Sequence, residues 1–138
     1  MTSTHAIAGL SLLTIRFGPP ETMDRLIASV GNRGLTVFAR IDHGAGAAAA
    51  GLPLRATELL IFGNARGGTP FTQVAQTAGI DLPLKALVWQ DEDGAVWIGW
   101  NDPAWIAARH DFAPDSKAIE NLREALAKIA NEAAGIAI

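Results

Sequence analysis

Two groups able to do acid–base chemistry are adjacent at Asp42-His43, where an expected strand gives way to a turn. A carboxylate beside an imidazole can orient the ring and raise its basicity, as a general base or a metal ligand requires. Adjacent residues of an extended strand point to opposite faces, however, so the two side chains need not touch. The alternative is that Asp42 caps the turn while His43 lies on the surface, and we favour it.

A glycine-rich segment, Gly63 to Thr69, precedes an expected helix that begins at Pro70. The free N–H groups of a helix N-terminus and the helix dipole favour an anion, and Arg66 would add a guanidinium. The Gly-Lys-Ser/Thr ending of a phosphate-binding loop is missing. The simpler interpretation is a tight turn in which Thr69 is the N-cap and Pro70 the first helical residue.

The remaining candidates lie on or near expected strands. Glu58 stands either at an exposed strand start or in an ion pair with Arg40 or Lys85. A buried carboxylate with a shifted pKa would mark a site, but a position at the strand end is the simpler expectation. Asn101 ends a later strand. The candidate ligand-binding residues are therefore Asp42, His43, Glu58, Asn64, Arg66, Gly67, Gly68, Thr69, Lys85 and Asn101.

Neither a metal nor a cofactor is expected. The three histidines lack ligand spacing, and the absence of cysteine excludes thiolate ligands and disulfides. The chain has no dinucleotide-binding fingerprint, no Walker motif and no Gly-x-Ser-x-Gly elbow. Four tryptophans between residues 89 and 105, in a chain without tyrosine, are expected in the core or at a dimer interface.

Composition limits the partners. The chain of 138 residues has a net charge of −3 and no basic run, which argues against nucleic acid and against a membrane surface. Apolar residues make up 49% and charged residues only 18%, which hints at a buried oligomer interface. We expect one cytoplasmic domain over residues 1–138, with a disordered tail of about residues 1–8.

Periodicity predicts the elements that must position these side chains. Alternation or apolar runs predict five strands, and a spacing of i, i+3, i+4 and i+7 predicts the face of a first helix. The segment Asp91 to Gly94 predicts a hairpin. The expected strands are 13–17, 35–42, 57–62, 84–90 and 95–101, and the expected helices are 19–31, 45–50, 70–79, 103–110 and one from about residue 115.

This order predicts an α+β fold: a mainly antiparallel sheet of about five strands with helices packed on one face. The strand at Leu59 to Phe62 is apolar on both of its faces, so both faces should be covered. A second subunit is the simplest cover for the face without helices.

Several separated runs resemble one family. FARIDHGAGAAAAGLPLRATELLIFGN, GTPFTQ, GIDLPLKALVW and WNDPAWIAARH occur in this order and are similar to the family called domain of unknown function 302. The resemblance covers about nine tenths of the chain. It implies a small bacterial α+β fold, often homodimeric, and it implies no reaction, because function resides in sites rather than folds.

Two functional hypotheses follow. The first is a non-enzymatic, homodimeric binding or interaction module. The second is a small-ligand protein, for an anionic metabolite, or an enzyme, with a pocket that gathers His43, Lys85, Asn101 and the Gly67-Gly68-Thr69 turn.

Overall fold

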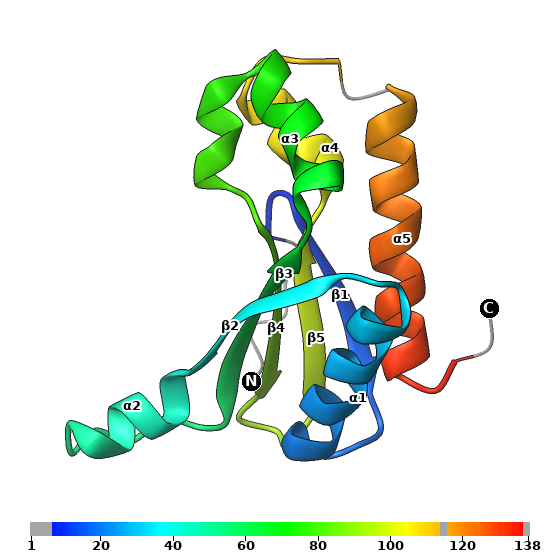
Figure 1. Cartoon of the computed structure of the whole chain (residues 1–138). Coiled ribbons are helices and arrows are strands. Elements are labelled where there is room, and N and C mark those ends of the chain that lie inside the picture. The colour runs from blue at the N-terminus through cyan, green and yellow to red at the C-terminus, as the bar shows by residue number, and fades with distance from the viewer. Residues whose placement is uncertain (1–6, 114–115, 137–138) are drawn as a thin grey trace.

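In the computed structural model, residues 7–113 and 116–136 are described, and they form one five-stranded sheet with helices (Figure 1). The elements in chain order are β1 (Leu10–Ile15), α1 (Pro19–Asn32), β2 (Thr36–Asp42), α2 (His43–Ala49), β3 (Thr57–Gly63), α3 (Ala65–Val74), the 3₁₀ helix η1 (Gln76–Ile80), β4 (Leu84–Gln90), β5 (Val96–Asn101), α4 (Pro103–Arg109) and α5 (Lys117–Ala133).

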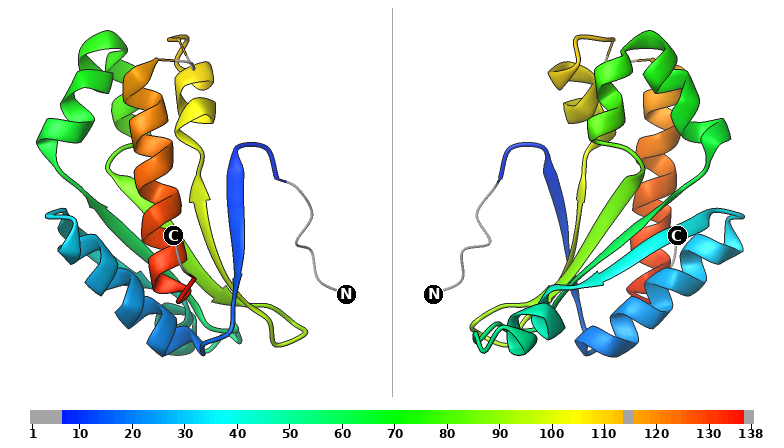
Figure 2. Two further views of the ribbon diagram at one scale, coloured as in Figure 1. Left: turned by 90° about the vertical axis from the view of Figure 1, so that its right-hand side faces the viewer. Right: turned by 60° about the vertical axis from the view of Figure 1, so that its left-hand side comes forward.

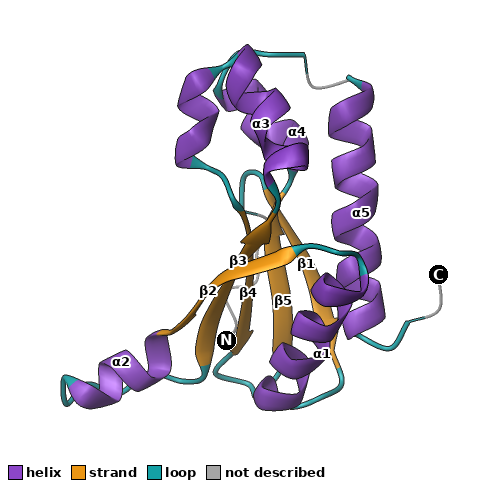
Figure 3. Ribbon diagram, viewed as in Figure 1, coloured by secondary structure: helices purple, strands orange, loops and turns teal. Residues whose placement is uncertain are grey.

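The strand order is β1-β5-β4-β3-β2, and every neighbouring pair is antiparallel (Figure 3). This confirms the predicted α+β fold with an antiparallel sheet. The predicted hairpin joins β4 to β5, with Gly94 at φ 86° in its turn, a conformation that glycine adopts without strain. Phe38 is an extra residue in β2 between the paired Val37 and Ala39, so the edge strand bulges there.

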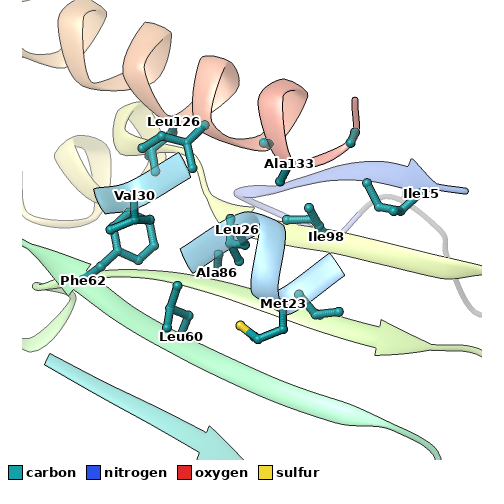
Figure 4. Close-up of a cluster of buried hydrophobic side chains, with 14 of the residues drawn as sticks. Ile15, Met23, Leu26, Val30, Leu60, Phe62, Ala86, Ile98, Leu126 and Ala133 are labelled. Carbon is teal, nitrogen blue, oxygen red and sulfur yellow. The ribbon is translucent and has the colours of Figure 1, made fainter. Parts of the chain in front are cut away.

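Helices α1 and α5 cover one face of the sheet and lie side by side (Figure 2). Arg25 and Ser29 of α1 donate hydrogen bonds to the α5 carbonyls of Ala133 and Ile129, at 2.7 and 3.2 Å. The core lies between these helices and the sheet (Figure 4), and its fully buried members include Met23, Leu26, Val30, Leu60, Phe62 and Ile98. The predicted inner face of α1 is therefore confirmed.

A smaller unit of α3, η1 and α4 lies beyond one end of the sheet (Figure 1). Phe71, Ala107 and Ile119 are buried there, and the rings of Phe71 and Phe112 lie 5.8 Å apart. Because Ile119 belongs to α5, this long helix connects the small unit to the main core.

The predicted start of α3 is wrong. The helix begins at Ala65, five residues before Pro70, because the side chain of Asn64 accepts a hydrogen bond from the Gly67 N–H at 2.7 Å. Asn64 is therefore the N-cap, and Thr69 lies inside the helix. Pro70 also lies inside, where it leaves the carbonyl of residue 66 without its helical partner.

Other boundaries shift by a few residues. The first strand begins at Leu10 and ends at Ile15, and α3 ends at Val74 before the separate helix η1. The last helix begins at Lys117, capped by Ser116, whereas the expected start at residue 115 lies outside the described residues. The expected disordered tail also falls mostly on residues 1–6, which are not described. Within the two described ranges, no helix is long and apolar enough to cross a membrane.

Candidate functional site

A cavity of about 380 Å³ lies between the start of α3, η1, α5 and the adjacent end of the sheet. This volume falls within the range of small-molecule sites. Most of the wall is apolar, and the lining residues carry no ionisable side chain. They are Leu35, Phe38, Gly63, Asn64, Ala65, Gly67, Gly68, Thr69, Thr72, Gly79, Leu82, Pro83, Leu84, Leu122, Ala125, Leu126 and Ile129.

The polar side chains of the cavity come from α3 and its cap. Asn64 uses its carbonyl oxygen to cap the helix, and the hydroxyl of Thr72 donates to the carbonyl of Thr69 at 2.9 Å. Four of the predicted site residues, Asn64, Gly67, Gly68 and Thr69, do line this cavity. The arrangement suits a ligand with an apolar body and a polar end that meets the first turns of α3.

Three predicted residues lie at the opposite end of the sheet. Asp42 pairs with Glu58 at one end of the β2–β3 ladder, and Thr36 pairs with Gly63 at the other. A seven-residue strand is roughly 20 Å long. His43, which follows Asp42, is therefore far from the cavity. Asp42 caps α2 through the Ala45 N–H at 2.8 Å, as the turn interpretation predicts.

Lys85 and Asn101 are on the other face of the sheet. Leu84 lines the cavity, and Lys85 follows it on β4, so its side chain points to the opposite face. Lys85 donates to the Pro83 carbonyl at 3.3 Å. Arg66 is exposed and is not part of the cavity lining. The predicted pocket around His43, Lys85, Asn101 and the glycine turn is therefore not assembled. The prediction of an anion at the turn stays a prediction.

Glu58 forms an ion pair with Arg40 across the β2–β3 ladder. The second contact, from Nη2 of Arg40 to Oε1 of Glu58, is 3.2 Å. The hydrogen bond to Glu58, reinforced by its charge, raises the pKa of Arg40 above its usual value. The pair lies at the sheet edge and stabilises the register of β2 against β3. Because both carboxylate oxygens of Glu58 accept hydrogen bonds from Arg40, the structure favours a structural role for Glu58.

The tight turn between β4 and β5 is organised by one carboxylate. Asp91 accepts hydrogen bonds from the indole Nε1 of Trp97 at 2.9 Å and from the backbone N–H groups of Asp93 and Ala95 at 3.0 Å each. The bond from Trp97 is the main reason why the pKa of Asp91 lies below its usual value, and the backbone bonds add to it. This cluster holds the Trp97 ring in place.

A cluster that sequence reasoning missed joins η1 to the end of α4. The Nε2 of His110 lies 2.6 Å from Oδ2 of Asp81, and its Nδ1 lies 2.9 Å from the hydroxyl of Thr77. Nη1 of Arg109 donates to both oxygens of Asp81, at 2.9 and 3.0 Å. No local sequence pattern predicts this cluster, because His110 and its partner Asp81 are about thirty residues apart in the chain.

The order hydroxyl, imidazole, carboxylate is one that can activate a nucleophile. A carboxylate only accepts, so Nε2 of His110 carries the proton, and Nδ1 is then free to accept from Thr77. Thr77 is nevertheless exposed and does not line the cavity. Because Arg109 also binds Asp81, the arrangement serves equally as a clamp between η1 and α4.

The sheet face opposite α1 and α5 carries no helix of the described chain (Figure 2). We call it the open face. By strand register it consists of Ala39, Ile41, Thr57, Leu59, Ile61, Lys85, Leu87, Trp89, Trp97, Gly99, Asn101, Leu10, Leu12 and Thr14. Lys85 is its single ionisable residue.

Two tryptophans make the open face flat at one end. The rings of Trp89 and Trp97 stack with centroids 6.4 Å apart. The ring of Trp89 also lies over Gly99, where a Cβ would come within 2.9 Å of it. Because Gly99 has no side chain, the Trp89 ring can pack flat against the sheet. This half-buried aromatic surface is the second candidate site.

Comparison with known proteins identifies the family and the fold. Residues 13–131 match the model of the family described as domain of unknown function DUF302, which confirms the resemblance. The crystal structure of an uncharacterized conserved DUF302 protein from Bacillus stearothermophilus superposes with a TM-score of 0.82 at 20% identity, covering 92% of this chain and 99% of that one. At this identity the match shows the fold alone.

Curated relatives contain a similar region within longer chains. Fluoride-specific ion channel FluC 1 of Brucella suis biovar 1 is 48% identical over 109 residues, which is 79% of this chain and 43% of the relative. FluC 1 of Brucella abortus biovar 1 is also 48% identical over 109 residues, and 40% of its length is covered. The chain thus spans about two fifths of the length of these relatives.

Proposed function

The chain belongs to the DUF302 family, and we propose that it serves as a non-enzymatic binding module that works as a homodimer. The observation that carries this proposal is the open face, where apolar and aromatic side chains, most of them only half-buried in the single protomer, extend across all five strands. A contiguous apolar surface of this kind marks an interaction site.

The chemistry of the open face favours a protein surface as its cover. Charged residues are depleted and aromatic residues enriched in the centre of protein interfaces, and the open face shares both features. A two-fold dimer would place the open face of one protomer against the open face of its partner. Such an interface needs no charge complementarity, except that the Lys85 ammonium of each copy must remain solvated or find a polar partner.

Sedimentation velocity at low micromolar concentration tests the proposal. We expect a species of about twice the chain mass of 14.5 kDa, because burial of both open faces excludes water from their apolar side chains. A single species at the chain mass across this concentration range would contradict the homodimer.

The Brucella relatives favour one class of partner for the module. A domain that occurs within longer chains acts beside the rest of those chains, and these relatives are named fluoride-specific ion channels. We propose that the partner of this chain is a membrane channel of that kind. Co-purification from detergent-solubilised membranes is expected, and its absence at micromolar concentrations of both proteins would argue against the pairing.

A second candidate function is small-ligand binding, favoured by the cavity of about 380 Å³. Its apolar wall and the polar groups of Asn64 and Thr69 suit a medium-chain carboxylate such as decanoate. We expect decanoate to raise the melting temperature, because a ligand that binds only the folded state stabilises it. Inorganic phosphate has no apolar body to bury, so we expect it to have little effect.

A cavity-filling variant makes this ligand test specific. Ala125→Trp places a large ring in the cavity and is expected to abolish the decanoate effect, whereas Glu120→Trp, at an exposed position of α5 outside the cavity lining, should retain it. Equal responses of both variants would exclude the cavity. A phosphate response that is lost in Arg66→Ala would instead support the anion site at the start of α3.

A further inference from the structure

A short segment extends from the body of the molecule and packs on little of it. We call it the arm: residues 43–54, which comprise α2 and the turn that follows it. In Figure 1 the arm projects beyond the β2 edge of the sheet. None of the residues of α2 is buried, and Leu52 and Leu54 in the turn are 63% and 52% exposed.

Few interactions within one chain stabilise the helical conformation of the arm. Helix α2 has seven residues, HGAGAAA, of which two are glycine. Isolated helices shorter than about 12 residues are marginal in water even when rich in alanine, and each glycine costs roughly 1 kcal/mol relative to alanine. The cap from Asp42 to the Ala45 N–H is its main polar support. The apolar arm is therefore expected to gain its packing from another molecule.

We propose that the arm of each protomer packs against the open face of a second copy of this chain. The inference rests on the proposed homodimer and specifies how it is built. Both surfaces are almost free of charge, since His43 is the only ionisable residue of the arm and Lys85 the only one of the open face. The arm also begins directly at the open face, because Ile41 belongs to that face and is followed by Asp42 and α2.

The area of the open face points to the same arrangement. Five strands about 4.8 Å apart, each rising about 3.3 Å per residue over some six residues, give a planar area of roughly 500 Å² per protomer. Stable interfaces bury about 800 Å² per partner. Two arms, related by the two-fold axis, would enlarge the contact beyond the open face itself.

Site-specific photocrosslinking tests the position of the arm. p-Benzoylphenylalanine in place of Ala48 on the arm is irradiated in a mixture of ¹⁵N-labelled and unlabelled protein, and the adducts are mapped by mass spectrometry. We expect adducts between labelled and unlabelled copies that involve peptides of β3, β4 or β5. The same group in place of Asn121, which is exposed on α5, is the matched control and should give no such adduct.

A second variant measures the contribution of the arm. Leu54→Ser removes an exposed apolar side chain without touching the core, so the fold should be unchanged. Burial of a leucine is worth enough to change a dissociation constant more than tenfold, so we expect at least a tenfold weaker dimer by sedimentation.

The outcomes separate this inference from the proposed function. A dimer that gives no inter-copy adducts at the open face, or whose dissociation constant is unaffected by Leu54→Ser, contradicts the proposed packing of the arm but leaves the proposed homodimer intact. A monomer at all concentrations overturns both. Adducts to the open face together with a weakened Leu54→Ser dimer support both.

Discussion

Replacement of Leu87 by aspartate is expected to convert the proposed homodimer into a monomer. Leu87 lies near the centre of the open face, between Leu59 of β3 and Gly99 of β5. In the dimer two such carboxylates would be buried against apolar side chains because of the two-fold symmetry, and the cation nearest to each on the open face is Lys85, two residues along β4. Because Lys85 offsets part of the desolvation cost, we take about 1.5 kcal/mol for each buried carboxylate, so the dissociation constant should rise by about a hundredfold.

Sedimentation velocity of Leu87→Asp beside the parent protein measures this effect. Asn121→Asp adds the same charge on the exposed side of α5 and should remain dimeric. Circular dichroism should show a folded chain in both variants, because Leu87 is only half-buried in the single protomer. A Leu87→Asp protein that still sediments as a dimer would place the interface elsewhere.

Replacement of Phe62 by alanine is expected to destabilise the fold by about 3–5 kcal/mol, the usual range for a buried phenylalanine. Phe62 is fully buried on β3, in the cluster formed with α1 and α5 (Figure 4). Its removal takes away the transfer free energy of the ring and leaves a cavity that the sheet and the two helices cannot close.

Urea unfolding gives this free energy, and it is best measured in the Leu87→Asp background, where folding is not coupled to association. Phe38→Ala is the matched control, since Phe38 is 54% exposed at the bulge of β2 and should change stability by only about 0.5 kcal/mol. Equal losses for the two variants would contradict the position of the core.

The sequence alone determined the elements with strong periodicity. The α1 face of Met23, Leu26 and Val30 is buried as its spacing predicts, because a helix with one apolar stripe has few ways to pack. The hairpin at Asp91 to Gly94 is likewise local. The antiparallel class of the sheet followed from the order of elements.

Local chemistry was not sufficient at the start of α3. Asn64 and Thr69 are both residues that cap helices, and the glycines between them tolerate either a turn or a helix. Burial of Phe71 in the small unit is a contact with α4 and α5, which no local pattern reveals. The prediction therefore placed the cap five residues too late.

Which candidate residues meet depends on how the strands and helices pack. His43 and the glycines of α3 follow opposite ends of the same two-strand ladder, and Lys85 points away from the cavity that Leu84 lines. Strand order and register set these relations, and no local pattern around these residues reveals either of them. The contact of His110 with Asp81 and Thr77 joins segments about thirty residues apart, so its geometry exists only once the helices have packed. The flat packing of Trp89 over Gly99 forms across the β4–β5 hairpin and depends on the register of that pair.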